Sequence, residues 1–266
     1  MAYAAGLGLT DERYFNTTSA GGVLAHPLFP VAPEWQMIVD ASGHVDDGLD
    51  VGERVAGVHA GHDLVLHQPI GAGREVVISM RPVAAMGTRA GAKAVTRFDA
   101  TSDDGAPVWT THMTTIYRGI AVDGPDRAPL DLPVPPVRSD GPRAVIERSI
   151  DIGPNAAHVY TECARIWNPI HTDRAVALAA GLPDIILHGT ATLALGVSAV
   201  LDHLDIDTTR VERLGCAFRS VVLMPNTLTV GIIEPAGGPN RSTTHFEITD
   251  RRGAVVVSAG YLVCRP

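Results

Sequence analysis

The chain has 266 residues, which is enough for one large domain or two of ordinary size. Its 45% hydrophobic and 19% charged residues are typical of a globular protein and exclude a largely disordered one. The formal net charge of -8 argues against nucleic acid or an anionic membrane surface as a partner. Because no segment reaches the ~20 apolar residues of a membrane span, and the N-terminus lacks a signal-peptide pattern, we expect a cytoplasmic protein.

The first half predicts consecutive strands joined by polar turns. Residues 98–105, FDATSDDG, end in glycine and precede a β-rich run through Val108, Trp109 and Tyr117. A similar pattern recurs at 246–253, FEITDRRG, which is followed by a valine run and Tyr261. Upstream of each lies another matching pair, at 69–76 and 221–228. This internal repeat predicts two antiparallel units of the same kind.

Residues 123–142, DGPDRAPLDLPVPPVRSDGP, lie between the two units and are rich in proline, aspartate and glycine. Such a stretch is typical of an extended linker that runs over the surface. We therefore divide the chain into a first unit at 1–122, a linker at 123–142 and a second unit at 143–266.

The second half opens with helices. Residues 156–165 predict a helix or an irregular segment, and 173–180 predict a short helix closed by Gly181. The run from 188 to 201 contains no Asp, Glu, Lys or Arg, so its helix should be buried nearly all round. A buried apolar helix followed by antiparallel strands predicts an α+β fold in which a sheet wraps around a central helix, the hotdog arrangement.

Two segments carry a motif: YTECARIWNPIHTD at 160–173 and AAGLPDIILHG at 179–189. Together they resemble the MaoC-like (R)-specific enoyl-CoA hydratase family, whose motif runs Gly-Asp-x-Asn-Pro-x-His and continues to His-Gly before the central helix. The residues that stand at matching spacing are Asn168, Pro169, His171, Asp173, Gly181, His188 and Gly189. The resemblance implies a double hotdog with a degenerate first copy, in which His26-Pro27 takes the place of His-Gly and Asn-Pro-x-His is missing.

One departure from the family matters most. The family's catalytic aspartate, which holds a water together with the histidine, falls on Ile166. Isoleucine accepts no proton, and loss of a positioned acid or base typically costs about 10²–10⁴-fold in rate. Glu162 is an alternative carboxylate, although it lies four residues before Ile166.

The remaining motif residues still offer chemistry. His171 is a competent general base, and the Asn168 amide could hold a water or the substrate carbonyl. The backbone N–H groups that begin at Gly189, with the positive end of the helix dipole, suit a thioester oxygen that becomes an oxyanion. We assign substrate contacts to Tyr160, Ile166, Trp167 and His188, with Trp167 as a pocket wall.

Each assignment has a structural alternative. His171 could be a capping or core histidine, and Pro169 and Gly189 could serve backbone conformation only. The first-half histidines His62, His67 and His112 are interpreted as surface or strand-face residues.

Three functions remain open. The first is hydrolysis of an acyl thioester, with a bulky acyl-CoA favoured, by a water activated at His171. The second is hydration or dehydration of an acyl thioester, and the third is a non-catalytic acyl-thioester-binding role. We expect CoA or a carrier protein as the thiol of the substrate, no other cofactor, no metal, and a possible homodimer. The single lysine, Lys93, among 21 basic residues suggests a high-GC genome such as that of an actinobacterium.

Overall fold

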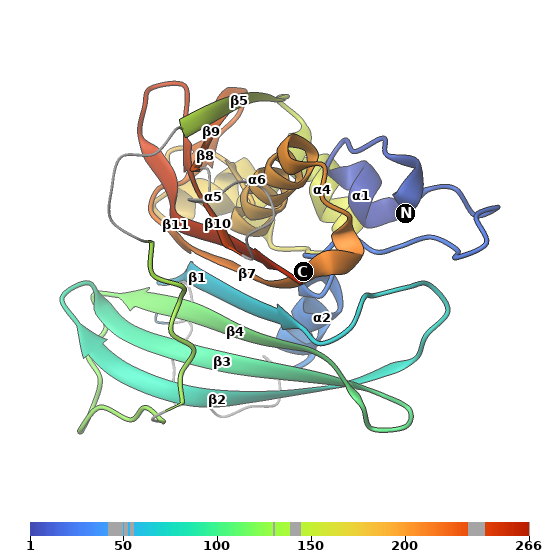
Figure 1. The fold of residues 1–266 in the computed structure, drawn as a ribbon. Coiled ribbons are helices and arrows are strands. Elements are labelled where there is room, and N and C mark those ends of the chain that lie inside the picture. Colours follow the sequence, from blue (N-terminus) through green and yellow to red (C-terminus); the bar gives the residue numbers. More distant parts are fainter. Residues whose placement is uncertain are drawn as a thin grey trace.

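The computed structural model of the protein describes residues 1–41, 50, 53, 56–129, 131–138, 145–233 and 243–265. Figure 1 shows two halves that lie side by side, each with a curved sheet and helices on one face. The elements of the first half are α1 (Ala2–Gly6), η1 (Glu12–Tyr14), α2 (Val31–Ala41), β1 (Gly57–Leu66), β2 (Val76–Thr88), β3 (Gly91–Ser102) and β4 (Pro107–Arg118).

The second half follows the same plan with additional elements around the motif segments. They are β5 (Val145–Ile152), α4 (Ala156–Ala164), η2 (Pro169–His171), α5 (Arg174–Ala179), β6 (Ile186–Leu187), α6 (Gly189–Leu204), η3 (Thr208–Arg210), β7 (Val211–Phe218), β8 (Val222–Leu223), β9 (Asn226–Ile233), β10 (Thr243–Thr249) and β11 (Val255–Cys264). The predicted helices and the repeated strand–turn–strand units are all present.

The sheet shows how the two halves are related. Nine of the described strands form one sheet in the order β2-β3-β4-β1-β7-β11-β10-β9-β5, and every neighbouring pair is antiparallel. The short strands β6 and β8 form a separate antiparallel pair. Outward from the central β1–β7 pair, the order β1-β4-β3-β2 on one side corresponds to β7-β11-β10-β9 on the other. The two copies therefore meet through equivalent strands, as in a two-fold dimer fused into one chain.

Helix α6 forms the core of the second half. Its apolar residues, among them Leu193, Val197 and Leu201, are buried, and the helix packs on β7, β9, β10 and β11. The helix lies close to β10 at Gly196, where an added Cβ would lie 2.6 Å from the end of the Ile248 side chain and 3.0 Å from the Phe246 ring. None of the described helices is both long and apolar enough to cross a membrane.

In the first half, helix α2 takes the place of α6 and carries a buried carboxyl group. Glu34 accepts hydrogen bonds from Trp109 Nε1 at 2.9 Å and Thr111 Oγ1 at 2.5 Å. Burial raises the pKa of Glu34 to about 8, although both hydrogen bonds act in the opposite direction. The contacts tie α2 to β4, so the helix is held by a polar anchor as well as by apolar packing.

The chain between the two halves crosses the sheet in an irregular path from the first half toward β5 (Figure 1). Its described parts, 123–129 and 131–138, contain no helix or strand, and only an isolated bridge joins Arg127 to Ala85. Leu130 and residues 139–142 of the predicted linker lie outside the described residues. The domain boundaries at 122 and 143 stay a prediction.

Candidate functional site

The Asn-Pro-x-His motif folds as a capped turn. Asn168 is the N-cap of η2, and its side-chain oxygen accepts a hydrogen bond from the Ile170 amide at 3.3 Å. Pro169 occupies the first position of the turn, where a missing N–H costs nothing. The cap occupies Asn168 Oδ1 and leaves the amide nitrogen as the group that could meet a substrate. The turn thereby fixes the backbone that carries His171.

His171 is a buried imidazole with a defined orientation. Its Nδ1 lies 2.8 Å from the Ile186 carbonyl oxygen, which requires a hydrogen on Nδ1. Burial lowers the pKa of His171 to about 4, although the bond to Ile186 favours the charged form. Near neutral pH the ring is therefore uncharged, and Nε2 carries a lone pair that can accept a proton.

His171 lies against the start of the central helix. Its ring stacks on that of His188, with centroids 3.6 Å apart and planes inclined by 22°. His188 is the N-cap of α6, but its side chain does not cap the helix. The first hydrogen bond of the helix runs from the Thr192 amide to the His188 carbonyl, so the amides of the first turn lack partners within the helix.

Gly189, the first residue of α6, is covered by an aromatic ring. A Cβ at this position would lie 3.2–3.3 Å from ring atoms of Phe218, the last residue of β7. The absence of a Cβ at Gly189 therefore lets the Phe218 ring lie close to the start of α6. Sequence analysis did not identify Phe218, because nothing in the motif indicates which strand end reaches the helix.

Tyr160 joins the site from α4. Its ring lies edge-on to His188 at 4.9 Å, and its hydroxyl lies 3.0 Å from the Tyr3 hydroxyl and 3.2 Å from Thr190 Oγ1. Burial raises the pKa of Tyr160 to about 12, so the phenol keeps its proton near neutral pH. Tyr3 was not predicted as a site residue; it reaches Tyr160 because α1 packs on α4.

Ile166 occupies the position of the family's aspartate. Its side chain is buried, and its carbonyl oxygen lies 3.3 Å from His188 Nε2. The next residue, Trp167, is half exposed and lines a hollow of about 260 Å³. Glu162 is exposed at the same hollow, and the other lining residues are His158, Thr161, Pro169 and Thr172. The structure therefore places Glu162 outside the buried histidine pair.

The first copy keeps part of the arrangement. Tyr3 and His26 correspond to Tyr160 and His188, and their rings lie 5.8 Å apart. Both ring nitrogens of His26 have partners, since Nδ1 accepts from the Leu28 amide and Nε2 lies 3.1 Å from Ser198 Oγ. The sequence of this copy lacks the Asn-Pro-x-His motif, and among the described residues no second imidazole stacks on His26.

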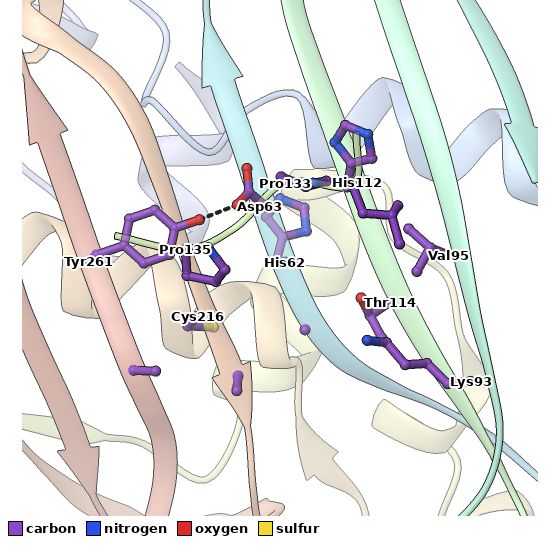
Figure 2. Close-up of a pocket in the computed structure, with 14 residues that line it drawn as sticks. His62, Asp63, Lys93, Val95, His112, Thr114, Pro133, Pro135, Cys216 and Tyr261 are labelled. Atoms are coloured by element: carbon purple, nitrogen blue, oxygen red, sulfur yellow. Dashed lines mark hydrogen bonds between the residues drawn. The ribbon is translucent and has the colours of Figure 1, made fainter. Parts of the chain in front are cut away.

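A separate cavity of about 270 Å³ lies at the junction of the halves (Figure 2). Its wall combines Lys93, Val95, His112 and Thr114 of the first half with Pro133 and Pro135 of the linker and Tyr261 of the second. Asp63 accepts hydrogen bonds from Arg213 and Tyr261 beside it. His62 belongs to the same stretch of β1. Its sequence was interpreted as that of a surface or strand-face residue; it lies on a strand face, and it is buried.

Comparisons with known proteins bear on the motif half first. A family model described as a MaoC like domain matches residues 139–252. The match covers most of the second half of the chain. The enoyl-CoA hydratase ChsH3 of Mycobacterium tuberculosis is 33% identical over 165 residues, a match that covers 62% of this chain and 55% of that protein. The chain thus spans about half the length of this curated relative.

Solved structures resemble the whole chain. The MaoC-like dehydratase from Phytophthora capsici has a TM-score of 0.83 at 20% identity, covering 99% of this chain and 90% of that one. Rv0216 of Mycobacterium tuberculosis, a double hotdog, has a TM-score of 0.61 at 14% identity, covering 98% and 89%. The comparisons confirm the predicted double hotdog fold and the predicted resemblance of the second half to MaoC-like proteins.

Proposed function

We propose that this protein is an enoyl-thioester hydratase or, in the reverse direction, a 3-hydroxyacyl-thioester dehydratase. The observation that carries the proposal is the stacking of an uncharged imidazole, His171, on His188. His188 is the N-cap residue of the buried helix α6, and its side chain makes no capping hydrogen bond. This arrangement pairs a base with free backbone amides within one small volume. The name of the 33% identical relative, an enoyl-CoA hydratase, supports the same chemistry.

The proposed reaction uses both parts of the site. The amides of the first turn of α6 donate to the thioester carbonyl oxygen and draw electron density from the C=C bond. His171 Nε2 takes a proton from water as the water oxygen bonds to Cβ, and the resulting enolate is held at the helix start. The proton then passes to Cα, so one water is added and the imidazole returns to its neutral form. The thiol of the substrate is CoA or a carrier protein.

Hydrolysis of a bulky acyl thioester, which the sequence favoured first, is the second candidate. The observation that favours it is the buried Ile166 side chain at the position of the family's aspartate, which leaves the motif without that carboxylate. Attack of water on the thioester carbonyl needs one base and one oxyanion hole. The MaoC-like domain and the hydratase relative give more support to the addition reaction.

One experiment separates the candidates. The purified chain is incubated with saturated and trans-2-enoyl CoA thioesters of several acyl sizes, while free thiol is measured with a reactive dye and acyl products by mass spectrometry. We expect water to add to enoyl substrates without thiol release. Thiol release from saturated substrates would favour hydrolysis instead, and binding without any conversion would indicate a non-catalytic role.

The matched variant for this experiment is His171→Ala. Because it removes the only proton acceptor assigned to the step, we expect kcat to fall by about 10²–10⁴-fold with little change in the fold. His171→Gln, which keeps a polar side chain of similar size, serves as the control for packing. A His171→Ala variant that retains the parent rate would exclude this residue from the mechanism.

A further inference from the structure

The ring of His188 has one nitrogen in contact with acceptors and one without a partner. Nε2 lies 3.3 Å from both the Ile166 carbonyl oxygen and Thr161 Oγ1. A carbonyl oxygen only accepts hydrogen bonds, so the tautomer that suits this contact carries its hydrogen on Nε2. Nδ1 then bears the lone pair, and among the described residues this fully buried atom has no hydrogen-bond partner.

In His171 the roles of the two ring nitrogens are exchanged. Its Nδ1–H points at the Ile186 carbonyl, and Nε2 has the free lone pair. The two ring centroids are 3.6 Å apart, so the two unpaired nitrogens lie within reach of a single molecule. A water that donates at about 2.8 Å to each of two acceptors bridges atoms as much as about 5 Å apart.

Burial gives both rings the same charge state. Loss of solvent lowers the pKa of each histidine, and the neighbouring His171 depresses the pKa of His188 further. Two uncharged imidazoles therefore offer two proton acceptors where the family offers one carboxylate and one imidazole. A buried acceptor without a donor is unfavourable, so a donor in the substrate complex would satisfy Nδ1.

We propose that His188 is a catalytic residue whose Nδ1 holds the reacting water together with His171 Nε2, in place of the missing carboxylate at position 166. This inference rests on the proposed hydratase function and names the group that orients its water. One hydrogen of the water is donated to His188 Nδ1 and the other to His171 Nε2, which leaves an oxygen lone pair directed at Cβ. During addition, the O–H bond to His171 breaks, the O–Cβ bond forms, and the proton is delivered to Cα. His188 retains its own hydrogen on Nε2 throughout.

The alternative is that the Nε2–H of His188 only holds the Ile166 carbonyl at the start of α6. Two isosteric variants distinguish these roles. His188→Gln places an amide near the Nε2 position, where it can still donate to the Ile166 carbonyl, but it has no atom at Nδ1. His188→Asn places its amide near Nδ1 and cannot reach the carbonyl.

If His188 holds the water, His188→Gln lowers kcat by about 10–100-fold while KM and the thermal unfolding temperature stay near those of the parent. His188→Asn keeps more of kcat than His188→Gln and unfolds at a lower temperature. If His188 only holds the Ile166 carbonyl, the order of the two kcat values is reversed and His188→Gln is fully active. That result would overturn the inference.

A rescue variant tests the assignment directly. Adding Ile166→Asp to His188→Gln supplies a carboxylate at the family's position, and we expect it to recover at least about tenfold of the lost kcat. Ile166→Asn in the same background is the control, because it has the same shape and lacks a strong proton acceptor. Equal rates for the two double variants would count against the inference.

Failure of the proposed function gives a different pattern. A parent enzyme that adds no water to any enoyl thioester contradicts both proposals together, whereas an active parent with an active His188→Gln contradicts only the role of His188. Nitrogen-15 NMR of labelled histidine gives a readout independent of turnover. We expect the Nε2–H tautomer for His188, and an Nδ1–H tautomer would overturn the inference.

Discussion

At the scale of single residues, the site depends on how closely a substrate can approach the first turn of α6. Phe218 lies so close to Gly189 that an added Cβ would contact its ring at 3.2–3.3 Å, and the ring would have to move to admit it. The ring and the glycine together define the entrance to the first-turn amides. Small changes here should therefore alter catalysis more than stability.

We predict that Gly189→Ala lowers kcat/KM by about 100-fold, the typical effect of losing one oxyanion-hole donor. The methyl group both crowds Phe218 and occupies the approach to the amides. The free energy of unfolding should change by less than about 1 kcal/mol, since alanine favours the helix by a similar amount. Steady-state kinetics and urea unfolding measure the two effects.

The companion variant Gly189→Ala with Phe218→Leu returns space to the site and should recover part of kcat/KM. An unchanged kcat/KM in Gly189→Ala would show that the thioester does not approach this glycine.

The sequence identified the motif residues but not their partners. His171, His188 and Gly189 were predicted from the resemblance of their motif to the MaoC-like family, and the structure brings them together at the start of one helix. Tyr3 and Phe218 lie far from the motif in the chain and reach it only through tertiary packing. The carbonyl oxygens that orient both imidazoles belong to isoleucines, whose side chains give no indication of this role.

At the scale of elements, the β1–β7 junction is the point where the two copies meet. Asp63 on β1 accepts two hydrogen bonds from Arg213 on β7 and one from Tyr261 on β11. Arg213 also donates to the Val134 carbonyl of the linker at 3.0 Å. Strands β1, β7 and β11 thus meet at the Asp63 carboxylate, and the linker is held to the same site through Arg213, beside the cavity of Figure 2. Local patterns predicted the strand pairs, whereas this junction depends on pairing between distant halves.

We predict that Asp63→Asn lowers the free energy of unfolding by about 2–4 kcal/mol, because it leaves a largely buried guanidinium without its counter-charge. The Arg97–Asp99 pair offers a matched control within one strand of the first half. Asp99 is more exposed, so Asp99→Asn should cost less than about 1 kcal/mol. Urea unfolding followed by tryptophan fluorescence measures both, and equal losses would contradict a special role for the junction.

At the scale of the whole molecule, the core contains an unusual number of uncharged histidines. Burial lowers the pKa of His26 to about 3 and that of His171 to about 4, and it holds the pKa of His62 and His188 well below the usual value. All four side chains are buried. Each must take up a proton when the chain unfolds below about pH 6.5, the ordinary pKa of histidine.

We therefore predict acid-induced unfolding between about pH 6.5 and pH 4. A histidine with a depressed folded pKa contributes stability that is fully present above its unfolded pKa and is lost as the pH falls toward the folded pKa. Each contributes up to about 1.4 kcal/mol per pH unit in this window. Four such groups together are comparable with the roughly 5–15 kcal/mol that stabilises a typical domain.

Glu34 acts in the opposite direction but is a single group. Its raised pKa, about 8, means that the folded state binds one extra proton between the unfolded carboxyl pKa and pH 8. It therefore offsets about one of the four histidines in the acid window, and it lowers stability as the pH rises toward 8. The greatest stability should fall between about pH 6 and pH 7.

The measurement is the free energy of unfolding in urea at a series of pH values. His62→Leu is the informative variant, since both ring nitrogens of His62 lack hydrogen-bond partners among the described residues and no assigned catalytic step involves it. It should reduce the slope of stability against pH by about one proton, or about 1.4 kcal/mol per pH unit. Glu34→Gln should remove the decline toward pH 8 and leave the acid limb in place. A stability profile that stays flat from pH 6.5 to pH 5 would mean that these imidazoles become charged inside the folded protein, and the uncharged histidine pair proposed for the site would then have to be abandoned.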